Sequence, residues 1–123
     1  MTKDEAIHGF WSRYGLTAYD ENTVPDNAQM PYITYGVSSG ALGDMILLHG
    51  SIWYRSESWR NISIKAGLIA EDVASHGHVI IPFDGGRLYL TQGVPFIQRM
   101  SDPSDDMIRR IYININAEFL SAY

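Results

Sequence analysis

The stretch MIRRIYININAEF (Met107–Phe119) decides the fold class of this chain. Its apolar residues alternate with polar ones, so Ile111 and Ile113 point one way while Tyr112 and Asn114 point the other. A repeat of two residues is the period of a β-strand, whereas a helix would repeat every 3.6 residues. The stretch therefore predicts a long strand with one face in the core.

Further strands are expected on both sides of turn signals along the chain. They are Pro31–Val37, Met45–Arg55, His78–Phe83 and Arg87–Gln92, and Leu16–Tyr19 is a candidate for one more short strand. Asp84-Gly85-Gly86 is a hairpin signal, and Pro82 belongs at a strand end or at a sheet edge. The region Gly93–Pro103 is expected to be irregular, with an acidic tip at Ser101–Asp106.

Two segments have helical periodicity. Thr2 and Glu5 form a capping-box pattern before a first helix, and Gly15 is placed to end it. A second helix is expected over 57–75, with Ser56 or Ser58 as its N-cap. Its apolar stripe comprises Trp59, Ile62, Ala66, Ile69, Ala70 and Val73.

The order of these elements predicts the fold. Hairpin-length links favour a largely antiparallel sheet of four to five strands, with the two helices packed on one face. No linker or repeat divides the chain, so residues 1–123 are expected to form a single α+β domain.

Composition narrows the classes of function. The 123 residues are 46% hydrophobic and 19% charged, which is typical of a globular domain. A formal net charge of -5 argues against general binding of nucleic-acid phosphates. With no cysteine, the chain has no disulfide and no thiolate site.

The start of the chain is charged, and no apolar run is long enough to span a membrane. MTKDEAIHGF lacks the apolar centre of a secretory signal, and no segment approaches about 18 consecutive apolar residues. The sequence therefore predicts a soluble protein that is not exported by the usual signal and has no membrane partner.

A polar segment without any period, Asp20–Met30, separates the first helix from the strand at Pro31. Loops of this length without structure of their own are uncommon in small domains and are often functional. The loop is therefore a candidate contact segment, and a simple solvated connection is the alternative.

Nothing in the sequence has the spacing of a catalytic site. His76 and His78 could share a strand face and hold a metal, but no third ligand is evident. Asp102, Asp105 and Asp106 lack the spacing of a calcium loop, which favours a solvated acidic loop. If these residues bind anything, a partner surface that carries arginine is as good a candidate as calcium. The expectation is a protein that is not an enzyme and has no cofactor or metal.

Aromatic residues lie on the strand faces opposite the clearer core residues. They are Trp53, Tyr89 and Tyr112. A second core layer or scattered surface aromatics would explain them. A sheet face covered by another subunit would explain them equally well.

Several stretches together resemble the minor structural proteins of long-tailed bacteriophages and prophages, and most closely the tail terminator, or tail completion, family. They are FWSRYG (Phe10–Gly15), AYDENTVPDNAQMPYITY (Ala18–Tyr35), SIWYRSESW (Ser51–Trp59), IIPFDGG (Ile80–Gly86) and GVPFIQRMSDPSDDMIRRIYININAEFL (Gly93–Leu120). The most telling element is V-P followed by P-Y-I-x-Y, formed by Val24, Pro25, Pro31, Tyr32, Ile33 and Tyr35.

The resemblance implies a structural protein of the virion tail or neck, assembled in the bacterial cytoplasm. Tail terminators are α+β domains that form a homo-oligomeric ring, usually a hexamer, on the end of the tail tube. Such a ring ends tube polymerisation, offers a surface to the head-completion or connector protein, and lets DNA pass as cargo. An acidic lumen would not trap that DNA.

The resemblance and the strand faces together suggest an assembly interface. Its candidate residues are Pro25, Asp26, Tyr32, Trp53, Tyr89, Asp102, Asp105, Asp106 and Tyr112. Two other functions stay open at this point. One is a head-completion or neck protein, and the other is a small metal- or ligand-binding domain that uses His76, His78 and the acidic loop.

Overall fold

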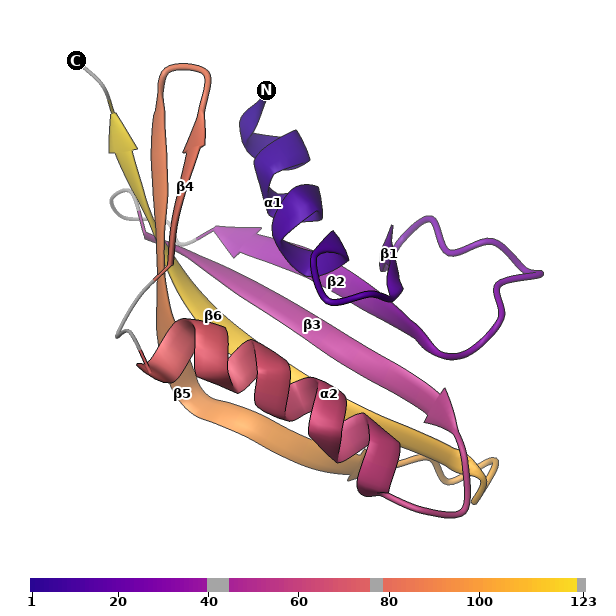
Figure 1. The fold of residues 1–123 in the computed structure, drawn as a ribbon. Coiled ribbons are helices and arrows are strands. Elements are labelled where there is room, and N and C mark those ends of the chain that lie inside the picture. The colour runs from indigo at the N-terminus through magenta and orange to yellow at the C-terminus, as the bar shows by residue number, and fades with distance from the viewer. Residues whose placement is uncertain (40–44, 76–78, 122–123) are drawn as a thin grey trace.

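A computed structural model describes residues 1–39, 45–75 and 79–121, which form two helices and one curled, mixed sheet (Figure 1). The helices are α1 (Lys3–Ser12) and α2 (Arg60–Ala70), and a π-helical turn at Glu71–Ser75 extends α2. The strands are β1 (Thr17–Asp20), β2 (Tyr32–Ser39), β3 (Met45–Arg55), β4 (Val79–Phe83), β5 (Gly86–Ser101) and β6 (Ile108–Ser121). The α+β class is confirmed.

The sheet differs in detail from the prediction of four to five largely antiparallel strands. It has six strands in the order β1-β2-β3-β6-β5-β4, and β1 pairs with β2 in parallel. The reason is the polar loop after Asp20. A short link would reverse the chain, whereas this loop carries it back beside the start of β1, so that β2 runs in the same direction.

The prediction of an irregular region after Gln92 is wrong, because β5 continues to Ser101. The pairing of β5 with β6 is interrupted only between Gln92 and Ile97. At this bulge, side chains of β6 bind carbonyls of β5. Asn114 donates to the Pro95 carbonyl at 2.9 Å, and Asn116 donates to the Gln92 carbonyl at 3.1 Å. These bonds explain how a strand containing Pro95 stays in the sheet.

The predicted start of α1 agrees with the structure, whereas the predicted start of α2 does not. The capping box of Thr2 and Glu5 is confirmed at the start of α1. By contrast, α2 begins at Arg60 and has no side-chain cap, so the prediction of a start at Glu57 with a serine N-cap is wrong. Ser58 accepts a hydrogen bond from the Arg60 backbone, and Ser56 accepts one from Ser58. The serines thus build a turn before the helix.

Both helices pack on the same face of the sheet, and one core lies between them and the strands (Figure 1). The core side of β6 carries Ile111, Ile113 and Ile115, which are all buried, as the alternating stretch predicted. Gly50 on β3 lies under Trp11 of α1, and a Cβ at that position would be 2.6 Å from the indole. The missing side chain therefore sets how closely α1 approaches the sheet.

The predicted hairpin and the predicted place of Pro82 are both confirmed at the edge of the sheet. The Asp84-Gly85 hairpin is present, with Gly85 at φ 91°. Pro82 lies in β4, the edge strand beyond β5, where a missing N–H costs no ladder bond. None of the helices described is long and apolar enough to cross a membrane.

Candidate functional site

The face of the sheet that points away from both helices carries a row of aromatic and polar side chains, which we call the open sheet face. Within the described ranges, no helix packs against it. Its side chains at the end where β2 begins and β3 ends are Tyr19, Tyr32, Thr34, His49, Ser51, Trp53, Arg110 and Tyr112. The register explains the grouping, because Tyr32, Trp53 and Arg110 lie opposite one another on β2, β3 and β6.

Three aromatic rings follow one another across neighbouring strands of this face. Tyr19 meets Tyr32 edge to face, with 5.7 Å between the ring centroids, and Tyr32 lies 6.5 Å from Trp53. The Trp53 indole N–H donates to the Thr34 hydroxyl at 2.9 Å. These contacts fix the rings in place, because each has a neighbour and Trp53 has a hydrogen-bond partner.

Arg110 continues the row on β6. Its guanidinium lies 4.7 Å from the centroid of the Trp53 ring and 5.7 Å from that of Tyr112. Its Nε donates to the hydroxyl of the buried Ser51 at 2.9 Å. Among the described residues, it has no carboxylate partner. The sequence analysis missed this residue, although it shares the strand face of Tyr112 by simple alternation.

The polar loop reaches the open sheet face through Glu21, the first residue after β1. Both carboxylate oxygens of Glu21 lie 3.1 Å from Nε2 of His49, and the His49 ring stacks on Tyr112 at 6.0 Å. Gly36 leaves room for this contact, because a Cβ there would be 2.4 Å from both partners. Glu21 thereby ties the loop to the aromatic row.

The predicted interface residues separate into groups. Tyr32, Trp53 and Tyr112 come together on the open sheet face. Tyr89 has the same orientation but lies opposite Glu118, about 20 Å from Tyr112 at roughly 3.3 Å per residue along β6. The alternation of each strand gave the orientation, but only the register gave the distance between residues on different strands.

Pro25 and Asp26 lie in the exposed loop between β1 and β2. The loop contains turns of its own, with the Thr23 backbone bonded to the Asp20 carbonyl and the Ala28 backbone to the Pro25 carbonyl, each at 3.0 Å. The loop is thus a folded surface segment.

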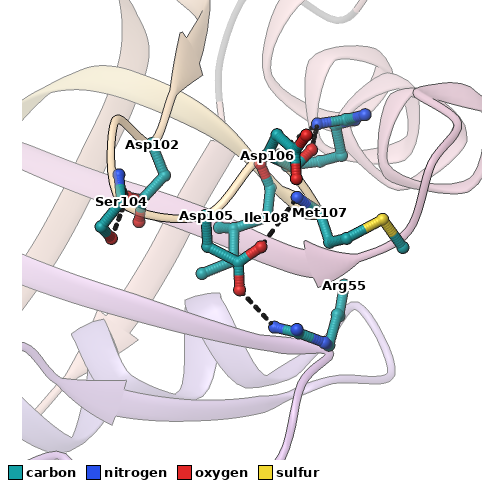
Figure 2. A network of polar contacts seen from close by, with 8 residues as sticks. Arg55, Asp102, Ser104, Asp105, Asp106, Met107 and Ile108 are labelled. Carbon is teal, nitrogen blue, oxygen red and sulfur yellow. Dashed lines mark hydrogen bonds and ion pairs between the residues drawn. The ribbon is translucent and has the colours of Figure 1, made fainter.

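The acidic tip is a tight turn between β5 and β6 (Figure 2). Asp102 accepts hydrogen bonds from the Ser104 backbone and hydroxyl at 2.8 and 2.6 Å. Asp105 accepts one from the Met107 backbone at 2.9 Å and pairs with Arg55 at 2.7 Å. These bonds lower the pKa of both carboxyl groups, chiefly through Ser104 for Asp102 and through Met107 for Asp105.

The carboxylates of this turn do not converge on one point. Asp102 and Asp105 bind groups of their own turn and Arg55, while Asp106 is exposed and uses its backbone carbonyl to accept a bond from Arg109. In the part of the chain that the structure covers, no three His, Asp or Glu side chains are placed to hold a metal ion. His76 and His78 lie outside the described residues.

A second arginine cluster that the sequence analysis missed lies at the start of α2, on the helix side of the sheet. Arg99 and Arg109 approach the ring of Trp59, with 4.9 and 5.5 Å to its centroid. Arg109 also donates to the Glu57 carbonyl at 2.9 Å. This cluster fastens the acidic turn to the segment before α2, because Arg109 also binds the Asp106 carbonyl.

A cavity of about 310 Å³ opens between α1, the end of β1 and β2. It is lined by Asp4, Ile7, Asp20, Glu21, Asn22, Tyr35, Gly36 and Val37. Tyr35 meets His8 at 3.0 Å, and burial raises the pKa of its phenol, with smaller effects of Asp20 and Asp4. Two of the three carboxylates that line the cavity have partners of their own, since Asp20 binds the Asn22 backbone and Glu21 binds His49.

Comparison with known proteins gave no match of any kind. No protein family, no curated protein and no solved structure matched this chain. Any function assigned to it rests on its own residues and on how the fold arranges them.

Proposed function

We propose that this protein is a virion assembly protein of a long-tailed phage or prophage, and specifically a tail terminator. It forms a homo-oligomeric ring, hexameric when assembled, that caps the tail tube, ends tube polymerisation and presents a surface to the head-completion or connector protein. The observation that carries the proposal is the open sheet face with its row of Tyr19, Tyr32, Trp53, Arg110 and Tyr112.

The composition of this face supports a role in assembly. Tyr, Trp and Arg are the residues that protein interfaces enrich and that contribute most of their binding energy. Leu47 and Met100 border the row on β3 and β5, and each is 38% exposed. A face of this kind, which no helix of the described residues covers, is typical of a contact with another protein.

The remaining features agree with passive transit of DNA and with the lack of a chemical step. The net charge of -5 keeps a ring lumen from binding phosphates. The resemblance of nearly the whole chain to tail terminators supplies the partners, which are a second copy of the chain, the tail tube protein and the connector protein.

The test is a capping assay with tail tube protein. We expect the purified protein to form rings in negative-stain images and to sit on one end of preformed tubes. Added during polymerisation, it should shorten the tubes in proportion to its concentration. A strict monomer that neither forms rings nor caps tubes would overturn the proposal.

The same assay separates the other functions considered for this chain. A protein that binds the connector and leaves tube growth unchanged would be a neck protein. Stoichiometric zinc or calcium in the purified chain would instead favour a metal- or ligand-binding domain. Metal analysis of the untreated protein should therefore accompany the imaging.

A further inference from the structure

We propose that Arg110 on the open sheet face receives the carboxylate of Asp106 from a second copy of this chain. The contact is head to tail and joins the acidic turn of one subunit to the aromatic row of the next. The inference rests on the proposed function and adds to it the two surfaces that meet in the ring.

Arg110 is prepared to bind an anion. The Trp53 and Tyr112 rings hold its guanidinium, and Ser51 occupies only its Nε. Its two terminal nitrogens have no hydrogen-bond or ion-pair partner among the described residues. A planar, fixed guanidinium with free Nη donors matches a carboxylate and loses little side-chain entropy on binding.

Asp106 is the carboxylate of the acidic turn that is available for such a contact. Asp102 and Asp105 accept hydrogen bonds from Ser104, Met107 and Arg55, and these bonds keep the turn in one shape (Figure 2). The Asp106 side chain is exposed, and across the described ranges its carboxylate accepts no hydrogen bond. The turn therefore presents one free negative charge on a preformed support.

The two groups do not meet within one subunit. Arg109 binds the Asp106 carbonyl, and the Arg109 side chain lies against Trp59 on the helix side of the sheet. Arg110, the next residue of β6, points to the opposite side. The two side chains are complementary in charge but form no ion pair with each other within the described subunit, and a neighbouring copy can complete the pair.

The contact also has an apolar border and a defined symmetry. Met100 lies opposite Arg110 on β5, Met107 follows Asp106 directly, and Pro103 is an exposed residue of the same turn. In a ring, the acidic turn and the open sheet face of each subunit meet two different neighbours, so the contact we propose is heterologous. Heterologous contacts close into rings when the rotation between subunits permits.

A charge-swap experiment tests the inference. Arg110→Glu and Asp106→Arg should each weaken association by about tenfold to 100-fold, because each places like charges together. The double variant R110E/D106R should restore association, and so should a one-to-one mixture of the two single variants. In that mixture, subunits alternate around the ring, and every contact again joins opposite charges. Light scattering and negative-stain imaging measure the outcome.

Matched controls come from the same chain. Arg87→Glu changes an exposed arginine at the far end of the open sheet face, and Asp4→Arg changes an exposed aspartate in the first turn of α1. Both should associate as the natural chain does. If Arg110→Glu fails to fold, Arg110→Gln replaces it in the experiment. Arg110→Gln should weaken association, and adding Asp106→Arg to it should not restore association. Thermal melts establish that each variant is folded.

The outcomes distinguish this contact from the proposed function. If the natural chain caps tubes but neither the double variant nor the mixture regains association, the Arg110–Asp106 contact is wrong and the tail terminator proposal stands. If the swap restores rings that never cap tubes, the contact is supported and the terminator proposal fails. Single variants that associate normally would also overturn the contact.

Discussion

Gly50 shows how one missing side chain decides the position of α1. The Trp11 ring occupies the space where a Cβ would lie, and the closest approach would be 2.6 Å. Trp11 is fully buried, so its ring has little room to move away. The glycine was visible in the sequence, but its partner on α1 was not.

We expect Gly50→Ala to lower the free energy of unfolding by about 1 to 3 kcal/mol, because the added methyl overpacks a full core. Gly67→Ala is the matched control. Gly67 lies within α2 with open space around it, so alanine should raise stability by about 0.5 to 1 kcal/mol. Urea titrations measure both. Equal effects of the two substitutions would contradict this account of Gly50.

Tyr112 is a residue at which folding and assembly can be separated. It stacks on His49 and borders Arg110 on the open sheet face, so it contributes little to the core between the sheet and the helices. A charge introduced there stays hydrated in a monomer but would be buried in a subunit contact.

We therefore expect Tyr112→Asp to reduce ring formation by at least about tenfold while shifting the unfolding free energy by no more than about 1 kcal/mol. Tyr112→Phe keeps the ring and should assemble almost normally. Light scattering reports association, and urea titration reports folding. Normal rings from Tyr112→Asp, or an unfolded monomer, would show that this face has another role.

At the scale of elements, the turn between β5 and β6 is held by carboxylates. Asp105 bonds to the Met107 backbone and then to Arg55, which joins the turn to the end of β3 (Figure 2). The Met107 bond is the main cause, and Arg55 a further cause, of the lowered pKa of Asp105. The folded turn therefore favours the charged carboxylate.

A pH dependence follows from the direction of this shift. A carboxyl group whose pKa is lowered by folding stabilises the fold above its unfolded pKa, and the stabilisation is lost as the pH falls through the folded pKa. The melting temperature of the natural chain should thus exceed that of Asp105→Asn near neutral pH, and the difference should shrink in acid. Melts between about pH 7 and about pH 3 measure it.

Asp26→Asn is the control for this titration. Asp26 lies in the exposed loop between β1 and β2, and among the described residues its side chain takes part in no ion pair. The melting temperature of Asp26→Asn should equal that of the natural chain at every pH. A difference for Asp105→Asn that stays constant down to acid pH would contradict the role of the ionised carboxylate.

At the scale of the whole molecule, both helices lie on one side of the sheet, and no helix of the described residues covers the other. A protein that is stabilised by self-association melts at a temperature that rises with its concentration, because mass action favours the associated folded state. We expect this rise for the natural chain. Tyr112→Asp should melt at one temperature across the same range of concentrations.

Calorimetry or fluorescence melts at several concentrations provide the measurement, with light scattering on the same samples. Tyr112→Phe serves as the matched variant that keeps the concentration dependence. A melting temperature of the natural chain that is independent of concentration, together with a monomer by scattering, would argue against self-association of the free protein.

Local patterns predicted most of the elements. The capping box of Thr2 and Glu5, the alternation in β6 and the turn at Gly85 each depend on neighbours a few residues away. The same is true of the orientation of Tyr32, Trp53 and Tyr112, because alternation along a strand assigns each side chain to a face. Interactions of this range can be derived from the order of residues alone.

Two of the missed features depend on contacts between distant segments. The parallel pairing of β1 with β2 requires the path of a long loop, and the continuity of β5 requires Asn114 and Asn116 to bind carbonyls across the sheet. The residues next to Pro95 in the sequence do not indicate that Asn114 and Asn116 will bind this part of β5. Long-range hydrogen bonds can therefore keep a strand where local propensity predicts a break.

The sequence by itself determined the α+β class and which side chains face away from the core, because both follow from short-range periodicity and capping. Only the tertiary structure decided that Tyr19, Tyr32, Trp53, Arg110 and Tyr112 form one row, and that Tyr89 lies far from it. The physical reason is strand register. Hydrogen bonds between β2, β3 and β6 set which residues stand side by side, and those strands are far apart in the chain.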